Sequence, residues 1–338
     1  MAKILVTGGI GYIGSHTVVE LHNAGYEVLI VDNLSNSSIK ILDQLHKITG
    51  KYHEFVELDL QDTLAVNNFA EQHPDIDGII HFAAYKAVGE SVREPLKYYK
   101  NNFYSLINLL TAYPTTNFVF SSSCTVYGQP DQLPVTEDSP VKKAESPYGN
   151  TKQIAEEILV ETAKVTPGLN VIALRYFNPV GAHETALIGE LPIGVPQNLI
   201  PFITQSAIGK RGPIQVFGDD YDTPDGSAVR DYIHVVDLAK AHVAAIKRLE
   251  DGKVESYDVF NLGTGRGSSV LEIINAFEQS TGEKLNYQIA PRREGDVEKT
   301  YGDVSKSKAI LGWQTELDLH EMMRSAWEWE KYLRDNPF

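Results

Sequence analysis

The sequence contains very little cysteine and no long apolar run. Cys124 is the one cysteine among 338 residues, which excludes an intrachain disulfide and a thiolate metal cluster. No stretch approaches the ~20 apolar residues that a membrane-spanning helix needs, and the first residues lack the pattern of a signal peptide. These absences predict a cytoplasmic protein with no membrane partner.

Positive charge is also scarce. The formal net charge is −15, from 30 Lys and Arg against 45 Asp and Glu. This excess of acid disfavours nucleic acid and anionic membranes as partners. An anionic small molecule is compatible with it only where arginines gather, as at Arg292-Arg293 and near Arg230. On local pattern alone these arginines, like Lys86, are equally typical of plain surface charge.

The order of predicted strands and helices indicates a Rossmann-like α/β fold. The strand patterns cover 3–7, 27–31, 55–58, 78–82, 118–120, 171–174 and 259–262. The helical patterns cover 13–24, 98–112, 148–163, 236–249, 270–279 and 317–332. This alternation predicts a doubly wound parallel sheet, in which ligands bind beyond the carboxyl ends of the strands.

The composition of the chain changes near residue 178, where Gly/Pro-rich loops begin to separate shorter predicted elements. We therefore expect two domains. Residues 1–177 form a Rossmann domain, and residues 178–338 form a smaller mixed α/β substrate domain, some of whose segments return to the main sheet.

A tyrosine and a lysine begin one of the predicted helices. Pro147 precedes an apolar-periodic run, which predicts that a helix starts there, with Tyr148 and Lys152 one turn apart on one face. Lowering a tyrosine pKa from ~10 to ~7 requires roughly 4 kcal/mol, about what one cation 4 Å away supplies at a surface-like dielectric. The pair thus suits removal of a proton from a hydroxyl, aided by an oxidised nicotinamide. Tyr/Lys pairs at this spacing are also common on solvated helix faces, so other motifs are needed to establish a catalytic site.

A glycine-rich loop follows the first strand. Gly9, Gly11 and Gly14 fit the dinucleotide pattern, in which glycines permit a tight turn and let backbone N–H groups approach a pyrophosphate at a helix start. Asp32 ends the second strand, where its carboxylate accepts from ribose hydroxyls and repels a 2′-phosphate. This context favours NAD over NADP as cofactor.

Polar residues elsewhere have two interpretations. Ser123 ends the run Ser121-Ser122-Ser123 after a strand, and it is either a backbone cap or a hydroxyl that bonds the reacting oxygen opposite Tyr148. His81, His183 and His234 lack metal-ligand spacing, so we expect them to be structural and expect no metal site.

Taken together, the motifs resemble the extended short-chain dehydrogenase/reductase family, and within it the UDP-glucose 4-epimerases. The similarity runs along nearly the whole chain. The matching blocks are Val6–His16, Asp32–Leu34, His81–Ala83, Lys86–Ser91, Ser121–Gly128, Ser146–Lys152, Leu174–His183, Asn198–Pro201, Val229–Val235 and Pro291–Asp296. The first and the Ser146–Lys152 block are shared by the whole superfamily, whereas Lys86–Ser91 and the blocks around Arg175 and Arg230 are more particular to the epimerases.

The resemblance implies NAD-dependent interconversion of UDP-galactose and UDP-glucose. Tyr148 would be the base at the sugar 4′-hydroxyl, Lys152 would lower the pKa of Tyr148 and hold the nicotinamide ribose, and Ser123 would bridge to the 4′-oxygen. NAD would stay tightly bound and be recycled in each turnover. The family commonly forms homodimers through two long helices, here the helices at 98–112 and 148–163.

The resemblance also assigns binding residues. The implied cofactor shell is Gly8, Gly11, Tyr12, Ile13, Gly14, Asp32, Asn33, Ser35, Asn36, Ser37, Asp59, Leu60, Phe82, Ala83, Lys86, Asn101, Tyr148, Lys152 and Phe177. The implied substrate contacts are Lys86, Ser123, Tyr148, Asn178, Asn198, Leu199, Phe217, Arg230, Arg293, Asp296 and Thr300.

Two positions depart from the family pattern. Cys124 replaces an alanine that many relatives carry after the serine run. At the sugar-pocket position that is either Tyr or small in the family, the alignment places Thr300, with Tyr301 next to it. A small residue would leave room for an N-acetyl group, so we expect activity on UDP-GalNAc and UDP-GlcNAc, an inference that one residue of slip would reverse.

Several alternative functions remain to be weighed. A sugar-nucleotide 4,6-dehydratase needs an acid/base carboxylate pair just after Ser123, where Cys124 and Thr125 stand instead. A UDP-glucuronate epimerase or decarboxylase differs in its sugar pocket, and an ordinary dehydrogenase releases reduced cofactor. A noncatalytic NAD-sensing regulator would typically lack the Tyr/Lys pair.

Overall fold

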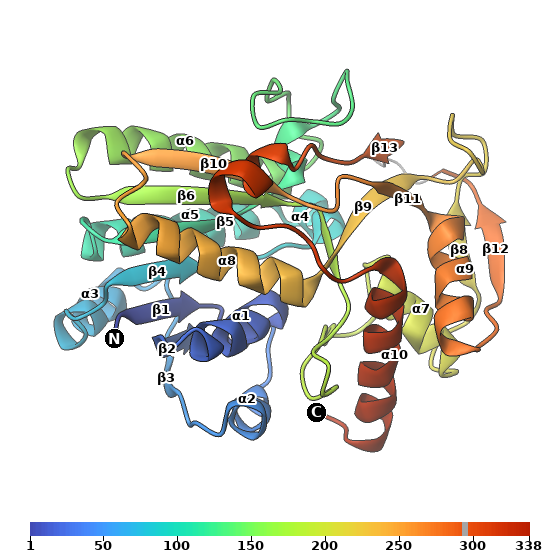
Figure 1. Cartoon of the computed structure of the whole chain (residues 1–338), viewed down its shortest axis with the longest axis horizontal. Coiled ribbons are helices and arrows are strands. Elements are labelled where there is room, and N and C mark those ends of the chain that lie inside the picture. The colour runs from blue at the N-terminus through green and yellow to red at the C-terminus, as the bar shows by residue number, and fades with distance from the viewer. Residues whose placement is uncertain (293–296) are drawn as a thin grey trace.

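The computed structural model describes residues 1–292 and 297–338, and its centre is one seven-stranded parallel sheet (Figure 1). The strands lie in the order β10-β6-β5-β4-β1-β2-β3. Their bounds are β1 (Lys3–Thr7), β2 (Glu27–Asp32), β3 (Glu54–Glu57), β4 (Gly78–His81), β5 (Asn117–Ser123), β6 (Asn170–Tyr176) and β10 (Tyr257–Leu262). The chain winds outward from β1 in one direction and from β4 in the other, so a ligand crevice is expected where the two strands diverge.

Helices cover both faces of this sheet. One face carries α1 (Tyr12–Asn23), α2 (Ile41–Thr49) and α8 (Val235–Glu250), and the other carries α3 (Thr63–Gln72), α5 (Pro95–Ala112) and α6 (Pro147–Val165). The short α4 (Val88–Arg93) precedes α5, and a 3-10 turn, η1 (Cys124–Tyr127), follows β5. The doubly wound Rossmann-like fold predicted from the sequence is confirmed.

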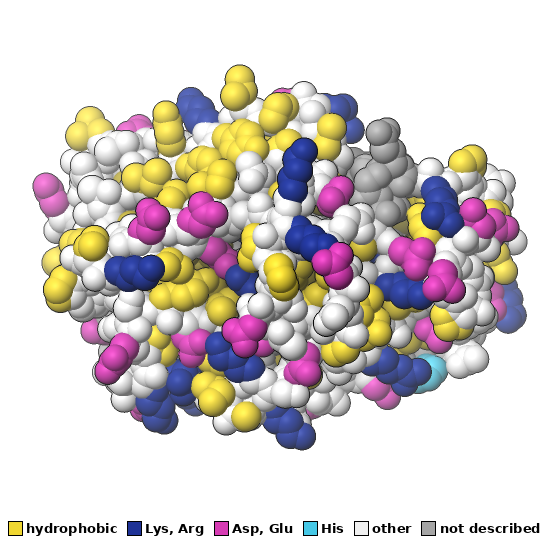
Figure 2. Space-filling model, turned by 90° about the horizontal axis from the view of Figure 1, so that it is seen from above, with side chains coloured by type: hydrophobic (Ala, Val, Ile, Leu, Met, Phe, Trp, Pro, Cys, Tyr) yellow, Lys and Arg dark blue, Asp and Glu magenta, His cyan; other side chains and the backbone are white. Residues whose placement is uncertain are grey.

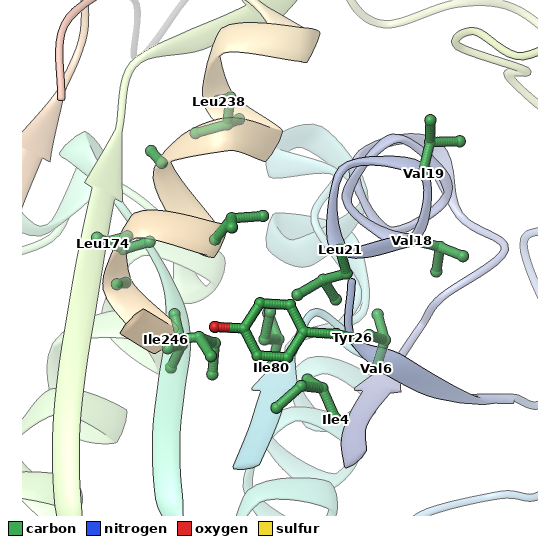
Figure 3. Close-up of a cluster of buried hydrophobic side chains, with 14 of the residues drawn as sticks. Ile4, Val6, Val18, Val19, Leu21, Tyr26, Ile80, Leu174, Leu238 and Ile246 are labelled. Carbon is green, nitrogen blue, oxygen red and sulfur yellow. The ribbon is translucent and has the colours of Figure 1, made fainter. Parts of the chain in front are cut away.

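The core beneath α1 and α8 shows why these helices pack where they do (Figure 3). Leu21 of α1 and Ile246 of α8 point toward one another across the side chain of Tyr26, above Ile4 and Ile80 of the sheet. The strands read as near-continuous apolar runs because helices bury both faces of a parallel sheet. The hydroxyl of Tyr26 donates to Glu250 at 2.7 Å, which satisfies its polar end.

The remaining elements form a smaller body beside the carboxyl ends of the strands (Figure 1). Its helices are α7 (Leu199–Ala207), α9 (Val270–Thr281) and α10 (Leu319–Asp335). A π-helical turn, η2 (Ser307–Leu311), packs instead against α8 and β10 of the main body. Its strands are β7 (Asn178–Val180), β8 (Ile214–Phe217), β9 (Val229–His234), β11 (Gly267–Ser269), β12 (Tyr287–Ala290) and β13 (Lys299–Thr300). β9 pairs with β7, β11 and β13, and β8 pairs with β12.

β10 belongs to the main sheet and α8 packs against that sheet, although both follow residue 178. The chain therefore crosses between the two bodies more than once. The division into residues 1–177 and 178–338 stays a prediction.

Several predicted boundaries shift for identifiable reasons. α5 starts at Pro95, three residues before the predicted start, because proline is favoured at the first helical position. α10 starts at Leu319, after Asp318 caps the helix by accepting from the N–H of Glu321. β6 extends through Tyr176, so Arg175 lies within the strand. Within the described residues, no helix combines the length and apolar character that a membrane span requires.

Candidate active site

α6 begins where the sequence predicted, and its first two turns carry the Tyr/Lys pair. Ser146 caps the helix, since its hydroxyl accepts from the N–H of Gly149 at 3.1 Å, and Pro147 occupies the first helical position. Tyr148 and Lys152 then lie one turn apart on the face that packs against β5. The local sequence thus fixes the rotation of the helix and directs both side chains toward the end of the sheet.

Tyr148 meets Ser123 at the carboxyl end of β5. Burial raises the pKa of Tyr148 to about 12, while a hydrogen bond from Ser123 acts in the opposite direction. Lys152 alone therefore does not bring the pKa of Tyr148 near neutrality. A further positive charge close to the phenol is needed for it to ionise at physiological pH.

The Lys152 ammonium is enclosed by the sheet. Its Nζ donates to the carbonyl oxygen of Ser121 at 2.5 Å, lies 4.7 Å from the Phe120 ring centroid, and lies 5.9 Å from that of Tyr148. Burial lowers the pKa of Lys152 to about 7, and the nearby Glu156 opposes that change. Because the charged and neutral forms are close in energy, small changes in surrounding charge decide the state of this lysine.

The glycine loop has the shape that a bound pyrophosphate requires. Gly8 has φ +67°, and a side chain at Gly14 would clash with the carbonyl oxygen of Gly8. α1 starts at Tyr12 with no side-chain cap at Gly11, so its first N–H groups face outward as donors. The loop can therefore receive an anion at the start of the helix.

Asp32 lies at the end of β2 with an ordered carboxylate. Its Oδ1 accepts from the N–H of Leu34 at 3.0 Å and from the hydroxyl of Ser37 at 2.8 Å. Because both bonds use the same oxygen, the carboxylate is held in one orientation while Oδ2 is available to a ribose hydroxyl.

The other predicted cofactor residues lie at the same edge of the sheet. They are Ile13 in α1, Asn33, Ser35 and Asn36 after β2, Asp59 and Leu60 after β3, Phe82, Ala83 and Lys86 after β4, Asn101 in α5 and Phe177 after β6. Phe177 packs where side chains at Gly263 and Gly302 would collide with its ring. The fold thus brings residues that are more than 150 positions apart in sequence to one edge of the sheet.

A glutamate that the sequence analysis did not single out connects two predicted ligand contacts. Oε1 of Glu190 lies 3.3 Å from Nζ of Lys86 and accepts from Nδ2 of Asn198 at 2.6 Å. The carbonyl oxygen of Glu190 accepts from Nε1 of Trp329 at 2.8 Å, which anchors the loop to α10. No local motif marks this residue, because Lys86 and Trp329 are 104 and 139 residues away in sequence.

The predicted substrate residues on the smaller body surround β9. Arg230 is in β9, Asn178 begins β7 beside it, Leu199 begins α7, and Phe217 ends β8. In the parallel register of β13 and β9, Thr300 is opposite Arg230. Arg293 and Asp296 lie outside the described residues.

The register also separates Thr300 from Tyr301. Side chains opposite each other in a parallel pair share a face, and the next residue along the strand points to the other face. The Tyr301 ring lies against Gly267 of β11, where an added side chain would meet it at 3.1 Å. Thr300, not Tyr301, therefore shares the face of Arg230.

Comparisons with known proteins place this geometry in a family. The family model described as GDP-mannose 4,6 dehydratase matches residues 5–326. The UDP-glucose 4-epimerase of Neisseria meningitidis serogroup B is 52% identical over 333 residues, covering 97% of each chain. The chain belongs to the UDP-glucose 4-epimerase family.

Solved structures agree with this assignment. The UDP-glucose 4-epimerase of Stenotrophomonas maltophila, with bound NAD and formylated UDP-arabinopyranose, has a TM-score of 0.95 at 46% identity and covers 99% of each chain. The UDP-Glc/GlcNAc 4-epimerase of Campylobacter jejuni has a TM-score of 0.84 at 38% identity, covering 98% of this chain and 100% of that one.

Cys124 and Thr125 follow Ser123, within η1, where a dehydratase needs its acid/base carboxylate pair. Burial raises the pKa of the Cys124 thiol to about 12. The described residues contain no group of three or more His, Cys, Asp or Glu suited to a metal ion. His81 bonds Thr7 and His234 caps α8, which gives these two histidines structural partners.

Proposed function

We propose that this chain interconverts UDP-galactose and UDP-glucose with NAD as a recycled cofactor. The observation that carries the proposal is the meeting of Ser123 and Tyr148 beside Lys152, at the edge of the sheet where the glycine loop and Asp32 also lie. When bound, NAD supplies the acceptor that takes a hydride from sugar C4 and gives it back.

The residues present suit NAD. The turn at Gly8 and the uncapped start of α1 offer backbone donors to a pyrophosphate, and Asp32 offers an oriented carboxylate to the adenosine ribose. The same carboxylate disfavours a 2′-phosphate. Lys86 and Phe177 would line the nicotinamide side, and Lys152 would hold the nicotinamide ribose.

The chain's own groups carry the proton transfer. Tyr148 Oη, ionised by the combined positive charge of Lys152 and the oxidised cofactor, takes the proton of the sugar 4′-hydroxyl. Ser123 bonds the same sugar oxygen and holds it opposite Tyr148. The resulting 4-keto sugar turns over within the site, so that the hydride returns to its opposite face and Tyr148 gives the proton back.

Proton NMR of UDP-galactose with purified protein and no added NAD tests this function. Conversion to a mixture dominated by UDP-glucose establishes both the reaction and a retained cofactor. Conversion only after NAD is added keeps the epimerase function but contradicts tight retention. No new sugar under either condition refutes the assignment, and growing 340 nm absorbance would instead identify a dehydrogenase.

We propose as a second activity the epimerisation of UDP-GalNAc and UDP-GlcNAc. The support is Thr300, whose small side chain shares the face of Arg230 while the Tyr301 ring lies on the other face. The relative from Campylobacter jejuni is a UDP-Glc/GlcNAc 4-epimerase. Turnover of UDP-galactose without turnover of UDP-GalNAc would refute this second activity.

We further propose that two copies pair through α5 and α6. Leu96, Tyr104 and Ile107 of α5 expose 81%, 50% and 44% of their surface. Exposing apolar side chains to water is unfavourable, and a second copy packed on this face would bury them. The face in Figure 2 carries charges of both signs scattered among apolar groups, with no continuous basic patch. Sedimentation velocity tests the dimer, and Ile107→Glu should yield monomers if this face is the contact.

A further inference from the structure

A third residue continues the row formed by Tyr148 and Lys152. Glu156 lies one turn beyond Lys152 on α6 and is 7% exposed. Its carboxylate meets Arg175 of β6, itself 6% exposed, with Oε2 at 2.6 Å from Nη2 and Oε1 at 3.0 Å from Nε. A buried, bidentate ion pair therefore lies one helical turn from Lys152, the proposed catalytic lysine.

Neighbouring polar groups complete the coordination of this pair. Ser122 donates its hydroxyl to Oε1 of Glu156, and Tyr257 donates to Oε2 at 3.3 Å. Nη1 of Arg175 donates to the hydroxyl of Tyr127 at 3.0 Å, and that hydroxyl donates to Asn261 at 2.6 Å. Ser122, Arg175 and Tyr257 all donate to the carboxylate, so both of its oxygens are held in place.

The serine run couples this pair to the proposed catalytic residues. Three consecutive serines of β5 each bond one of three successive turns of α6. Ser123 bonds Tyr148, the carbonyl oxygen of Ser121 accepts from Lys152, and the hydroxyl of Ser122 donates to Glu156. The hydrogen bond between Ser122 and Glu156 thus helps to fix where α6, with Tyr148 and Lys152, lies along β5.

The groups that face Lys152 from each element can be named. α6 contributes Tyr148 and Glu156, β5 contributes the Phe120 ring and the Ser121 carbonyl, β4 contributes His81, and β6 contributes Arg175 behind Glu156. Burial lowers the pKa of His81 to about 3, so this imidazole is neutral at physiological pH. Glu156 is therefore the carboxylate that acts on the Lys152 ammonium.

We propose, on the basis of the proposed epimerase function, that Glu156 is a positioning residue that keeps the Lys152 ammonium charged and in line with Tyr148. Arg175 holds the Glu156 carboxylate in place. The buried ammonium is costly in an apolar setting, and a fixed negative charge one turn away offsets that cost. A lysine that lost its proton would no longer favour ionised Tyr148 and would be a weaker donor to a ribose hydroxyl.

The experiment separates charge from shape at position 156. Glu156→Gln keeps the volume and removes the charge, whereas Glu156→Asp keeps the charge and shortens the side chain. Lys152 is titrated by NMR in the full chain labelled with ¹³C at lysine Cε, and Lys152→Met assigns its signal. This readout does not depend on turnover.

We expect the titration midpoint of Lys152 to fall by about one pH unit in Glu156→Gln and to stay near the wild-type value in Glu156→Asp. In the pH profile of kcat, the alkaline limb should move to lower pH in Glu156→Gln, with KM changed less than about 2-fold because Glu156 does not contact substrate. Tyr257→Phe, which removes one bond to Glu156 without removing charge, should shift neither measurement.

Other outcomes overturn the proposal. Equal midpoints in wild type and Glu156→Gln, or equal shifts in Glu156→Gln and Glu156→Asp, would show that Glu156 only packs. If Glu156→Gln does not fold, Glu156→Gln/Arg175→Met replaces the pair by neutral groups, and it should show a smaller fall in the midpoint, because the opposing charge of Arg175 is lost with that of Glu156. A wild type that epimerises no sugar refutes the proposed function, while the Lys152 titration still decides the electrostatic role of Glu156.

Discussion

Thr300 and Arg230 stand opposite each other in the parallel register of β13 and β9, which places both side chains on one face of this small sheet. Tyr301 turns to the other face and lies against Gly267. The pairing puts Thr300, and not Tyr301, on the face of Arg230, because a shift by one position would exchange the two faces.

Thr300→Tyr should therefore narrow the sugar specificity. The added ring would fill the space proposed for the N-acetyl group, so kcat/KM for UDP-GalNAc should fall by about 100-fold while that for UDP-galactose stays within about 3-fold. Steady-state kinetics with both sugars measure this. Tyr301→Phe is the matched control and should alter neither. Unchanged UDP-GalNAc turnover in Thr300→Tyr would place the gate elsewhere.

Tyr148→Phe should abolish turnover while the fold survives. The ring fills the same volume, but the oxygen that takes the sugar proton is gone, so kcat should fall by at least about 1,000-fold. Ser123→Ala, which leaves Tyr148 in place, should cost about 10- to 100-fold. NMR of UDP-galactose conversion measures both, and circular dichroism checks the fold. A Tyr148→Phe variant with near wild-type kcat would exclude Tyr148 as the base.

Lys152 should make the stability of the NAD-free protein depend on pH. Its pKa is lowered to about 7 in the folded chain from an ordinary value of 10.5. Between these values the unfolded chain binds more protons, so the free energy of unfolding should rise with pH there. Below pH 7 the lysine is charged in both states, and the full cost of burying that charge is present.

Lys152→Met should remove this dependence. We expect the variant to be more stable than wild type by roughly 2 to 4 kcal/mol below pH 7, with the difference vanishing toward about pH 10.5. Urea unfolding at several pH values measures it. Lys164→Met, at an exposed position of the same helix, is the control. A constant difference between Lys152→Met and wild type at every pH would contradict the lowered pKa.

Glu190→Gln should weaken substrate binding more than chemistry. Glu190 joins Lys86 and Asn198, and its loss of charge should free both side chains. Because Lys86 is 46% exposed, the ion pair contributes modestly, and we expect KM for UDP-galactose to rise about 3- to 10-fold with kcat within about 2-fold. Glu184→Gln in the same loop is the control. A fall in kcat at constant KM would instead point to a role in the chemical step.

Much of the fold follows from short-range patterns. The apolar strands, the glycine turn, Pro147 at a helix start and the i, i+4 spacing of Tyr148 and Lys152 each depend on neighbours within a few residues. Such patterns predicted the parallel sheet and the rotation of α6, both of which are confirmed. Helix starts such as Pro95 were placed a few residues late, because the first turn of a helix needs no apolar periodicity.

The sequence by itself determined the kinds of chemistry available: a dinucleotide loop, an acidic residue after the second strand, and a phenol with an ammonium one turn away. Only the tertiary structure decided the pKa values of the site residues and which side chains share a face of a sheet. Burial at the end of β5, not the spacing of Lys152, dominates the pKa of Tyr148. Glu156 meets Arg175 across 19 residues of chain, Glu190 meets Trp329 across 139, and Thr300 faces Arg230 through strand register. Desolvation and register are properties of packed elements, so no local pattern encodes them.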